Sequence, residues 1–109
     1  MKGKIVLVPF PFTDLTSTKR RPCLVICERP LDVLVAFISS VIPKSIESNT
    51  VLISPSHSEF SLTGLKKESI LYVDKLATLS KKIVVGELGE VGRKLKRKIN
   101  RAIQKTIKI

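Results

Sequence analysis

Residues 22–42 read PCLVICERPLDVLVAFISSVI, and this stretch decides the fold class. It contains two apolar runs, 22–28 and 33–42, separated by a turn around Pro30. Short runs rich in Val, Ile and Phe and bounded by turn residues are typical of β-strands. We therefore predict two strands joined by a turn. The first is expected to be buried on both faces because its apolar run is unbroken.

Shorter β-rich segments flank these two strands. Residues 4–12 (KIVLVPFPF) predict a first strand, and Pro9 and Pro11 place its end at a sheet edge or bulge. Residues 13–21 are polar and lack periodicity, so they predict a long loop. The remaining expectations are strands at 50–54 and 69–73, a loop over 55–69, and a short sixth strand or a turn at 75–80.

The last segment predicts an amphipathic helix. Glycines at 86, 89 and 92 are expected to break the chain ahead of it, and apolar side chains then recur every three or four residues from Val91 to Ile107. The predicted fold is mainly β with a C-terminal helix, in one domain over 1–109. A strongly curved antiparallel sheet or small barrel covers about 3–85, and a helix over about 91–107 packs across it.

Positive charge is concentrated in the C-terminal segment. The chain has 20 Lys and Arg against 9 Asp and Glu, a net charge of +11. Residues 93–108 hold eight basic side chains and no acidic one, whereas residues 1–92 carry a net charge of only +3. The excess predicts a polyanionic partner, which is nucleic acid, an acidic membrane surface or an acidic protein. The basic segment is either a solvated helix face or a surface that attracts phosphate.

Residues that commonly serve metal or acid–base chemistry are scarce. His57 is the single histidine and lies in a Pro/Ser-rich stretch, which favours a surface-loop role. Cys23 and Cys27 have no further soft ligands nearby in the sequence, which favours buried apolar fillers over a zinc site. We therefore expect no metal and no cofactor. Reduced thiols without an export signal predict a cytoplasmic protein, and no apolar run reaches the ~18 residues of a membrane span.

Arginine and lysine remain as candidates for chemistry. Lys19, Arg20 and Arg21 close the predicted loop at 13–21, and Pro22 holds the backbone of Arg21 extended. A guanidinium stays charged at any working pH and fits phosphate through its planar fork. The alternative interpretation is a plain cluster of surface charge.

Hydroxyl groups are the second candidate. Ser39 and Ser40 interrupt the strand predicted at 33–42. Neighbouring strand residues face opposite sides, so at most one of these serines shares a face with a given arginine. The alternative is that the hydroxyl of such a strand serine bonds only to backbone.

Four segments, taken in order, resemble the MazF/PemK family of toxins. They are 3–27 with PFPFTD and RRP, 33–42 with AFISS, 71–82 with DKLATL, and the glycine-punctuated lead to the C-terminal helix. The resemblance implies an SH3-like barrel and a sequence-preferring, metal-independent endoribonuclease that cuts single-stranded RNA (mRNA) to 2′,3′-cyclic phosphate and 5′-hydroxyl ends. It also implies a homodimer, and an antitoxin protein of a type II toxin–antitoxin system that fills the RNA groove.

The same resemblance suggests roles for individual residues. The catalytic arginine of the family directly precedes the RP proline, which makes it Arg21 here, and its catalytic hydroxyl falls on Ser39 in place of the usual threonine. Serine keeps the oxygen and loses the methyl group that restricts the rotamer. The residues predicted to contact RNA are Phe12, Thr13, Lys19, Arg20, Lys75 and Thr78. Among the aromatic residues, Phe12 and Phe60 are expected to stack on bases at loop ends, and Phe10, Phe37 and Tyr72 to be core.

Two other functions remain open. The same barrel could be a non-catalytic nucleic-acid-binding module, because a basic surface is sufficient for salt-dependent binding. It could also be a toxin-like protein that acts by binding a protein target such as a topoisomerase, as related barrels do. Cleavage of RNA separates both of these from an endoribonuclease.

Overall fold

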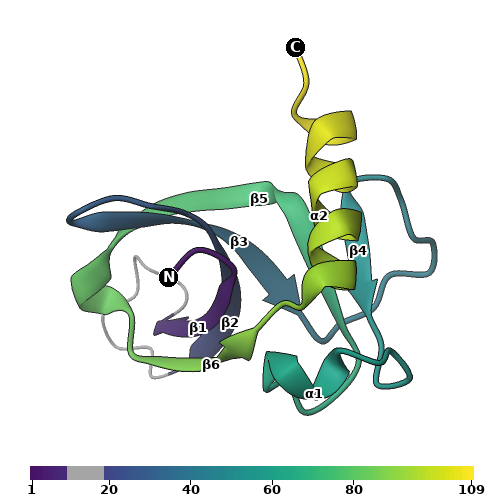
Figure 1. The fold of residues 1–109 in the computed structure, drawn as a ribbon, viewed down its shortest axis with the longest axis horizontal. Coiled ribbons are helices and arrows are strands. Elements are labelled where there is room, and N and C mark those ends of the chain that lie inside the picture. The colour runs from purple at the N-terminus through teal and green to yellow at the C-terminus, as the bar shows by residue number, and fades with distance from the viewer. Residues whose placement is uncertain (10–18) are drawn as a thin grey trace.

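Six antiparallel strands form one sheet within residues 1–9 and 19–109, which are the residues that this computed structural model describes. The strands are β1 (Lys4–Pro9), β2 (Arg20–Glu28), β3 (Asp32–Ser39), β4 (Thr50–Ile53), β5 (Ser69–Ser80) and β6 (Gly86–Glu90), and their order across the sheet is β4–β5–β3–β2–β1–β6. The sheet curls into a half-barrel, and α2 (Arg93–Thr106) packs against β4 and β5 (Figure 1). The predicted fold class, mainly β with a C-terminal helix, is confirmed.

The N-terminal end of β2 starts earlier than the sequence predicts. Arg20 and Arg21 were expected to close a loop, but they belong to the strand and pair with Pro9 and Val8 of β1. The ladder between β1 and β2 therefore includes the two arginines, because backbone hydrogen bonds do not depend on side-chain polarity. Residues 10–12 of the predicted first strand, and most of the predicted loop, lie outside the described residues.

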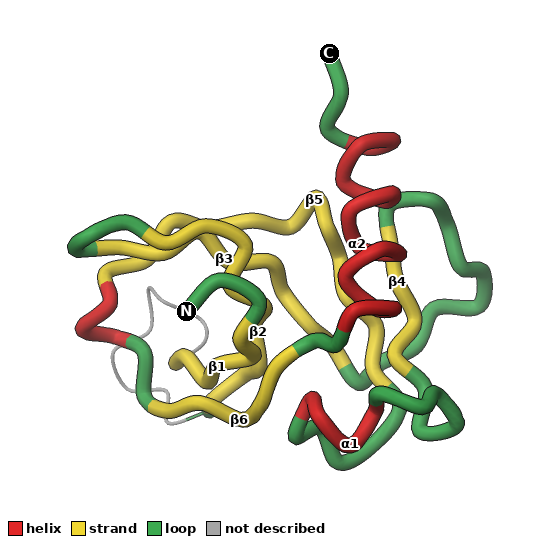
Figure 2. Tube along the Cα trace, viewed as in Figure 1, coloured by secondary structure: helices red, strands yellow, loops and turns green. Residues whose placement is uncertain are grey.

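β5 is one strand with an interruption, where the sequence predicts two separate segments. Ala36 of β3 pairs with Leu76, and the next residue, Phe37, pairs with Tyr72, so the register skips residues 73–75. These three residues form a bulge at which β5 bends (Figure 2). The backbone N–H of Val73, inside the bulge, donates instead to the carbonyl of Asn49 at 3.0 Å. The bulge is the reason why the sequence suggests two segments, 69–73 and 75–80, where the structure has one strand.

Gly86 and Gly89 do not break the chain as predicted, whereas Gly92 does lie between β6 and α2. Gly86–Glu90 is β6, which pairs with β1 and extends the sheet beyond residue 85. A short helix, α1 (Phe60–Thr63), lies in the predicted 55–69 loop and packs on β6 so closely that a Cβ on Gly89 would lie 2.2 Å from the carbonyl oxygen of Leu62. The glycine is thus required by a backbone contact and is compatible with a strand.

Two apolar clusters occupy the two faces of β1, β2 and β3. One contains Val6, Cys23 and Val25, with members of other strands. The other contains the alternate residues Ile5 and Leu24 and is completed by α2. This alternation confirms that β2 is buried on both faces, as its unbroken apolar run predicts.

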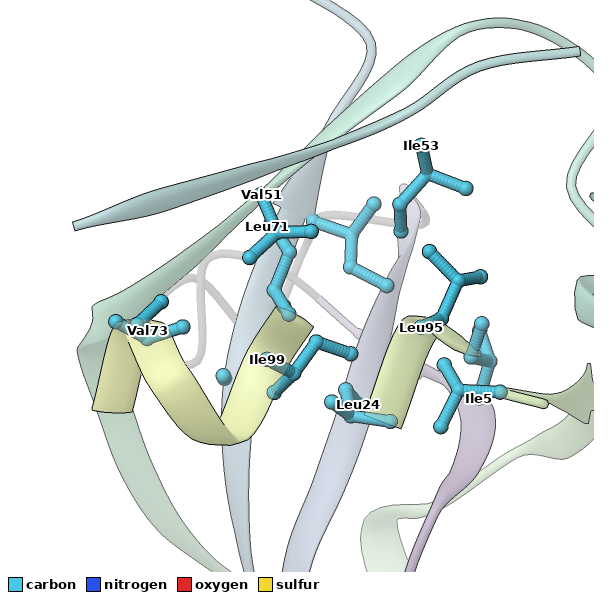
Figure 3. Close-up of a cluster of buried hydrophobic side chains, with 12 residues drawn as sticks. Ile5, Leu24, Val51, Ile53, Leu71, Val73, Leu95 and Ile99 are labelled. Carbon is cyan, nitrogen blue, oxygen red and sulfur yellow. The ribbon is translucent and has the colours of Figure 1, made fainter. Parts of the chain in front are cut away.

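The apolar stripe of α2 covers the second cluster. Its buried members include Leu95, Ile99 and Ala102, all no more than 6% exposed, and Val91 lies just before the helix. Figure 3 shows Leu95 and Ile99 among side chains that come from the sheet, including Leu24 and Leu71. Ile107, which the stripe would include, is 44% exposed because the helix ends at Thr106. None of the helices in the described part of the chain has the length and apolarity that a membrane crossing requires.

Cys23 is a packing residue. It is fully buried, and burial raises the pKa of its thiol to about 12. A thiol that stays protonated at neutral pH is a poor nucleophile and a poor metal ligand. This agrees with the predicted role of an apolar filler. Cys27 is half-buried, and both cysteines are free.

The start of α2 is held by a residue that lies far away in the sequence. Both carboxylate oxygens of Glu59 accept hydrogen bonds from the helix, at 3.0 Å from the backbone N–H of Lys94 and at 2.9 Å from that of Leu95. Gly92 makes room for this contact, since a Cβ there would lie 2.4 Å from the carboxylate carbon. The hydrogen bond from Lys94, followed by that from Leu95, lowers the pKa of Glu59 below its ordinary value.

This contact predicts a pH effect on stability. Because the folded-state pKa of Glu59 is lowered, its contribution is complete above the ordinary value of 4.5 and is lost as the pH falls through the folded-state pKa. Glu59→Gln is therefore expected to destabilise the protein at pH 7 and to flatten the fall in stability below pH 4.5. The measurement is denaturant unfolding of wild type and variant between pH 3 and pH 7.

Glu28 supplies the control for this experiment. Hydrogen bonds from Lys81 and from the N-terminal ammonium lower its pKa to about 2, so it also contributes to acid sensitivity. Glu28→Gln removes that second contribution and leaves the cap of α2 in place. Glu59→Gln is compared with its parent both in wild type and in the Glu28→Gln variant. If it leaves the pH dependence of stability unchanged in both, the hydrogen bonds of Glu59 to α2 do not act through its charge.

Candidate functional site

A cavity of about 710 Å³ opens where β2 begins, β3 ends and β5 bulges. Its lining residues are Arg21, Phe37, Ile38, Ser39, Val41, Tyr72, Asp74, Lys75 and Leu76. Three of the residues singled out from the sequence, Arg21, Ser39 and Lys75, thus share one cavity although they come from three strands.

The strand register explains why Arg21 and Ser39 lie together. β2 and β3 pair up to Cys23 and Phe37, and continuing this register by two residues sets Arg21 opposite Ser39. Residues opposite each other on antiparallel strands project from the same face of the sheet. Arg21 is an exposed residue and lines the cavity.

The hydroxyl of Ser39 is oriented by the chain that follows it. Ser39 is the last residue of β3, and its Oγ accepts a hydrogen bond from the backbone N–H of Val41 at 3.0 Å. The backbone partner considered from the sequence therefore exists, but it occupies only an acceptor position. A hydroxyl also has one donor, and the O–H of Ser39 can donate to an anion in the cavity.

The bulge of β5 supplies the opposite wall. Lys75 lies over the ring of Tyr72, with its Nζ 4.1 Å from the ring centroid. Asp74 accepts hydrogen bonds from Nδ2 of Asn49 at 3.1 Å on each of its carboxylate oxygens. Residues 72–75 therefore present an aromatic ring, a carboxylate and an ammonium, each with a partner that orders it.

Asp74 and the aromatic walls were missed by reasoning from the sequence. Phe37 packs against the first cluster, as expected of a core residue, and also lines the cavity. Tyr72 was expected in the core but lines the cavity, and Phe60, expected at a loop end, packs against the second cluster. The placement of Phe37 and Tyr72 in the cavity depends on the skipped register of β5, which involves long-range pairing. The available signal was Asp74 itself, an acidic residue directly after the apolar run 69–73.

Other predicted RNA contacts lie elsewhere. Arg20 is exposed, but strand alternation turns it away from the face of Arg21, and it does not line the cavity. Lys19 precedes β2 and Thr78 pairs with Leu34 beyond the bulge, and neither is among the described residues of the cavity wall. The predictions for Phe12 and Thr13 fall on residues outside the described part of the chain.

Comparison with known proteins identifies the family. The family model of the PemK-like, MazF-like toxin of type II toxin–antitoxin systems matches residues 1–107, so the chain belongs to this family. The resemblance noted in the sequence is thereby confirmed. A search of curated proteins gave no match.

Solved structures share the fold at low sequence identity. An endoribonuclease from a mycobacterial species, in complex with its cognate antitoxin, is 20% identical with a TM-score of 0.72, covering 98% of this chain and 93% of that one. A second mycobacterial endoribonuclease is also 20% identical, with a TM-score of 0.70 and coverage of 98% and 89%. The Mycobacterium tuberculosis toxin MazF-mt6 is 16% identical, with a TM-score of 0.74 and coverage of 97% of both chains.

Proposed function

We propose that this toxin is a sequence-preferring endoribonuclease that cuts single-stranded RNA in the cavity between β2, β3 and β5. The observation that carries the proposal is the shared cavity wall of Arg21, Ser39 and Lys75. Family membership and the endoribonuclease activity of two structural neighbours support it. The reaction is attack of a ribose 2′-oxygen on the adjacent phosphorus, which needs no metal and leaves 2′,3′-cyclic phosphate and 5′-hydroxyl ends.

Arg21 and Ser39 would stabilise the pentacoordinate phosphorus. Two N–H groups of the guanidinium face two non-bridging oxygens, where negative charge increases during attack. The Ser39 hydroxyl, held by Val41, donates to one of the same oxygens. Both groups are fixed on strands, so little reorganisation is needed when RNA binds.

The two proton transfers require other groups, because a guanidinium stays protonated at any working pH and so neither takes up nor releases a proton readily. As the bond from the 2′-oxygen to phosphorus forms, the carboxylate of Asp74 takes the 2′-hydroxyl proton. As the bond from phosphorus to the 5′-oxygen breaks, the ammonium of Lys75 protonates the leaving oxygen. Asp74 and Lys75 are adjacent in the bulge, and both line the cavity. DNA lacks the 2′-hydroxyl and would not be cut.

We also propose that the toxin binds an antitoxin protein, forms a homodimer and acts in the cytoplasm. The cavity rim carries two exposed apolar side chains, Val41 at 76% and Leu76 at 37%. Together with Arg21 and Lys75 they suit a peptide segment that carries both apolar and acidic residues. One structural neighbour is a complex with its cognate antitoxin. An antitoxin segment in this cavity would exclude RNA, and a homodimer would present two such cavities.

The test is an RNA-cleavage assay in EDTA with the ends mapped to the nucleotide. Cleavage at a preferred motif, with 2′,3′-cyclic phosphate and 5′-hydroxyl products, is expected. Salt-dependent RNA binding without cleavage would instead favour a nucleic-acid-binding module, and capture of a topoisomerase without any action on RNA would favour a protein-binding toxin. Either result would overturn the proposal.

Ser39→Ala is expected to lower kcat by about 10- to 100-fold, because one donor to the non-bridging oxygens is lost. Ser39→Thr keeps the hydroxyl and restores the usual residue of the family, so it should cut at least as fast as wild type. Single-turnover cleavage of a mapped RNA measures both. Equal rates for wild type and Ser39→Ala would show that the hydroxyl serves only the backbone of Val41.

A further inference from the structure

We infer that a second pocket, between β4 and α2, is a phosphate-binding site that holds the RNA strand outside the catalytic cavity. This inference rests on the proposed function. The pocket has a volume of about 290 Å³. Its lining residues are Ser48, Thr50, Val51, Leu52, Lys98, Arg101, Ala102 and Lys105.

Three cations of α2 converge on this pocket. Lys98, Arg101 and Lys105 are spaced by three and four residues, which places them along one face of the helix. All three are exposed, and no acidic side chain in the described part of the chain forms an ion pair with any of them. Like charges on one helix face repel each other. An anion in the pocket would relieve that repulsion.

The second pocket adjoins the catalytic cavity. Thr50 lines the second pocket, and it pairs across the ladder with Tyr72, which lines the catalytic cavity. Neighbouring strands are about 4.8 Å apart, so the backbones of these two lining residues are one strand spacing apart. β4 is an edge strand and lies beside α2 (Figure 1), which lets a chain pass over Tyr72 and around the edge to the helix.

This placement favours RNA over an acidic protein. A single strand with its scissile phosphate at Arg21 would bring another of its phosphates over the edge of β4, where Lys98, Arg101 and Lys105 can neutralise it. Thr50 offers a hydroxyl donor at the same place, although it already donates to the carbonyl of Glu47 at 2.7 Å and would have to turn. Phosphate contacts of this kind add affinity without reading sequence, and the cleavage motif would not change.

The test is the triple variant Lys98→Gln/Arg101→Gln/Lys105→Gln, assayed on two RNAs that share the mapped motif. One RNA is just long enough for the catalytic cavity, about 5 nucleotides, and the other has about 20. On the long RNA, KM should rise about tenfold with kcat unchanged, and the slope of log affinity against log salt should fall by about 2 for three lost contacts. On the short RNA, both constants should match wild type.

The matched control is Arg93→Gln/Lys94→Gln/Lys96→Gln, which removes the same charge from residues of α2 that do not line the pocket. It should leave KM on the long RNA near the wild-type value. An equal rise in KM for both triple variants would mean that only bulk charge matters. A first variant that cuts both RNAs like wild type, or that loses only antitoxin binding, would likewise overturn the inference.

A binding measurement separates this inference from the proposed function. The probe is a 20-nucleotide single strand built entirely of 2′-deoxynucleotides, which cannot be cut at any position because it lacks the attacking hydroxyl. If wild type leaves RNA intact but binds this strand through the three cations, the proposed function fails and the inference stands. If wild type cuts RNA and both triple variants bind the strand as wild type does, the inference fails and the proposed function stands.

Discussion

Replacing Arg21 with alanine is expected to lower RNA cleavage by about 10³-fold or more, which corresponds to about 4 kcal/mol of transition-state stabilisation. The loss is large because the phosphorus gains negative charge in a cavity where the guanidinium of Arg21 faces it on a rigid strand. Binding of RNA should change much less, since Lys75 and the other cations remain. Single-turnover cleavage and binding of an uncut analogue, measured side by side, separate these two effects.

Arg20→Ala is the matched control for this prediction. It removes the same side chain from the neighbouring position on β2, whose side faces away from the cavity. We expect a rate within about tenfold of wild type, because only long-range attraction for RNA is lost. Both arginines are exposed, so neither variant should unfold. Comparable cleavage by Arg21→Ala and wild type would remove Arg21 from the mechanism.

Arg21→Lys separates charge from geometry. Lysine keeps the positive charge but loses the fork that addresses two oxygens at once. The expected rate lies between those of wild type and Arg21→Ala, closer to the alanine variant. A lysine variant as active as wild type would show that a point charge is sufficient at this position.

Gly64→Ala is expected to destabilise the protein by about 3–4 kcal/mol. Two costs combine at this position. Its φ of 73° lies in the left-handed region, and a Cβ would lie 2.1 Å from the carbonyl oxygen of Leu88 in β6. The backbone atoms of β6 cannot turn aside as a flexible side chain can. Denaturant unfolding should show a lower midpoint with an unchanged m-value.

Three other glycines separate these two costs. Gly3 has φ of 85° but meets only the flexible end of Lys96 at 3.4 Å, so Gly3→Ala should show the conformational cost alone, about 1 kcal/mol. Gly89 has the backbone contact without a positive φ, so Gly89→Ala should cost about 2–3 kcal/mol. A Cβ on Gly86 meets nothing within 4 Å, and Gly86→Ala should be close to neutral. Equal stability of the Gly64 and Gly86 variants would show that α1 can move away from β6 without cost.

The parts of the fold that follow from local pattern could be predicted from the sequence. The apolar runs of β2 and β3 and the stripe of Leu95, Ile99 and Ala102 are repeated local signals. The skipped register of β5 is different, because it depends on β3 and on Asn49, which lie far away in the sequence. The prediction of a chain break at Gly86 and Gly89 was wrong for the same reason. Gly89 is needed for a contact with α1, which no local pattern shows.

The candidate site also has residues that local sequence indicates and residues that depend on long-range pairing. Arg21 stands out because Pro22 follows it, and Ser39 because it interrupts an apolar strand. Their meeting in one cavity required the register between β2 and β3, which the sequence does not display. Asp74 and Tyr72 depend on the bulge in β5, which is why one was overlooked and the other was assigned to the core.

The bulge also changes which way neighbouring side chains of β5 point. Residues 73–75 contribute no ladder pairs to β3, so they do not follow the strict alternation of a paired strand. Two of them, Asp74 and Lys75, face the cavity. In a regular strand, two adjacent residues would point to opposite faces of the sheet. The irregular backbone of the bulge thus lets the base and the acid of the proposed reaction stand next to each other on one wall.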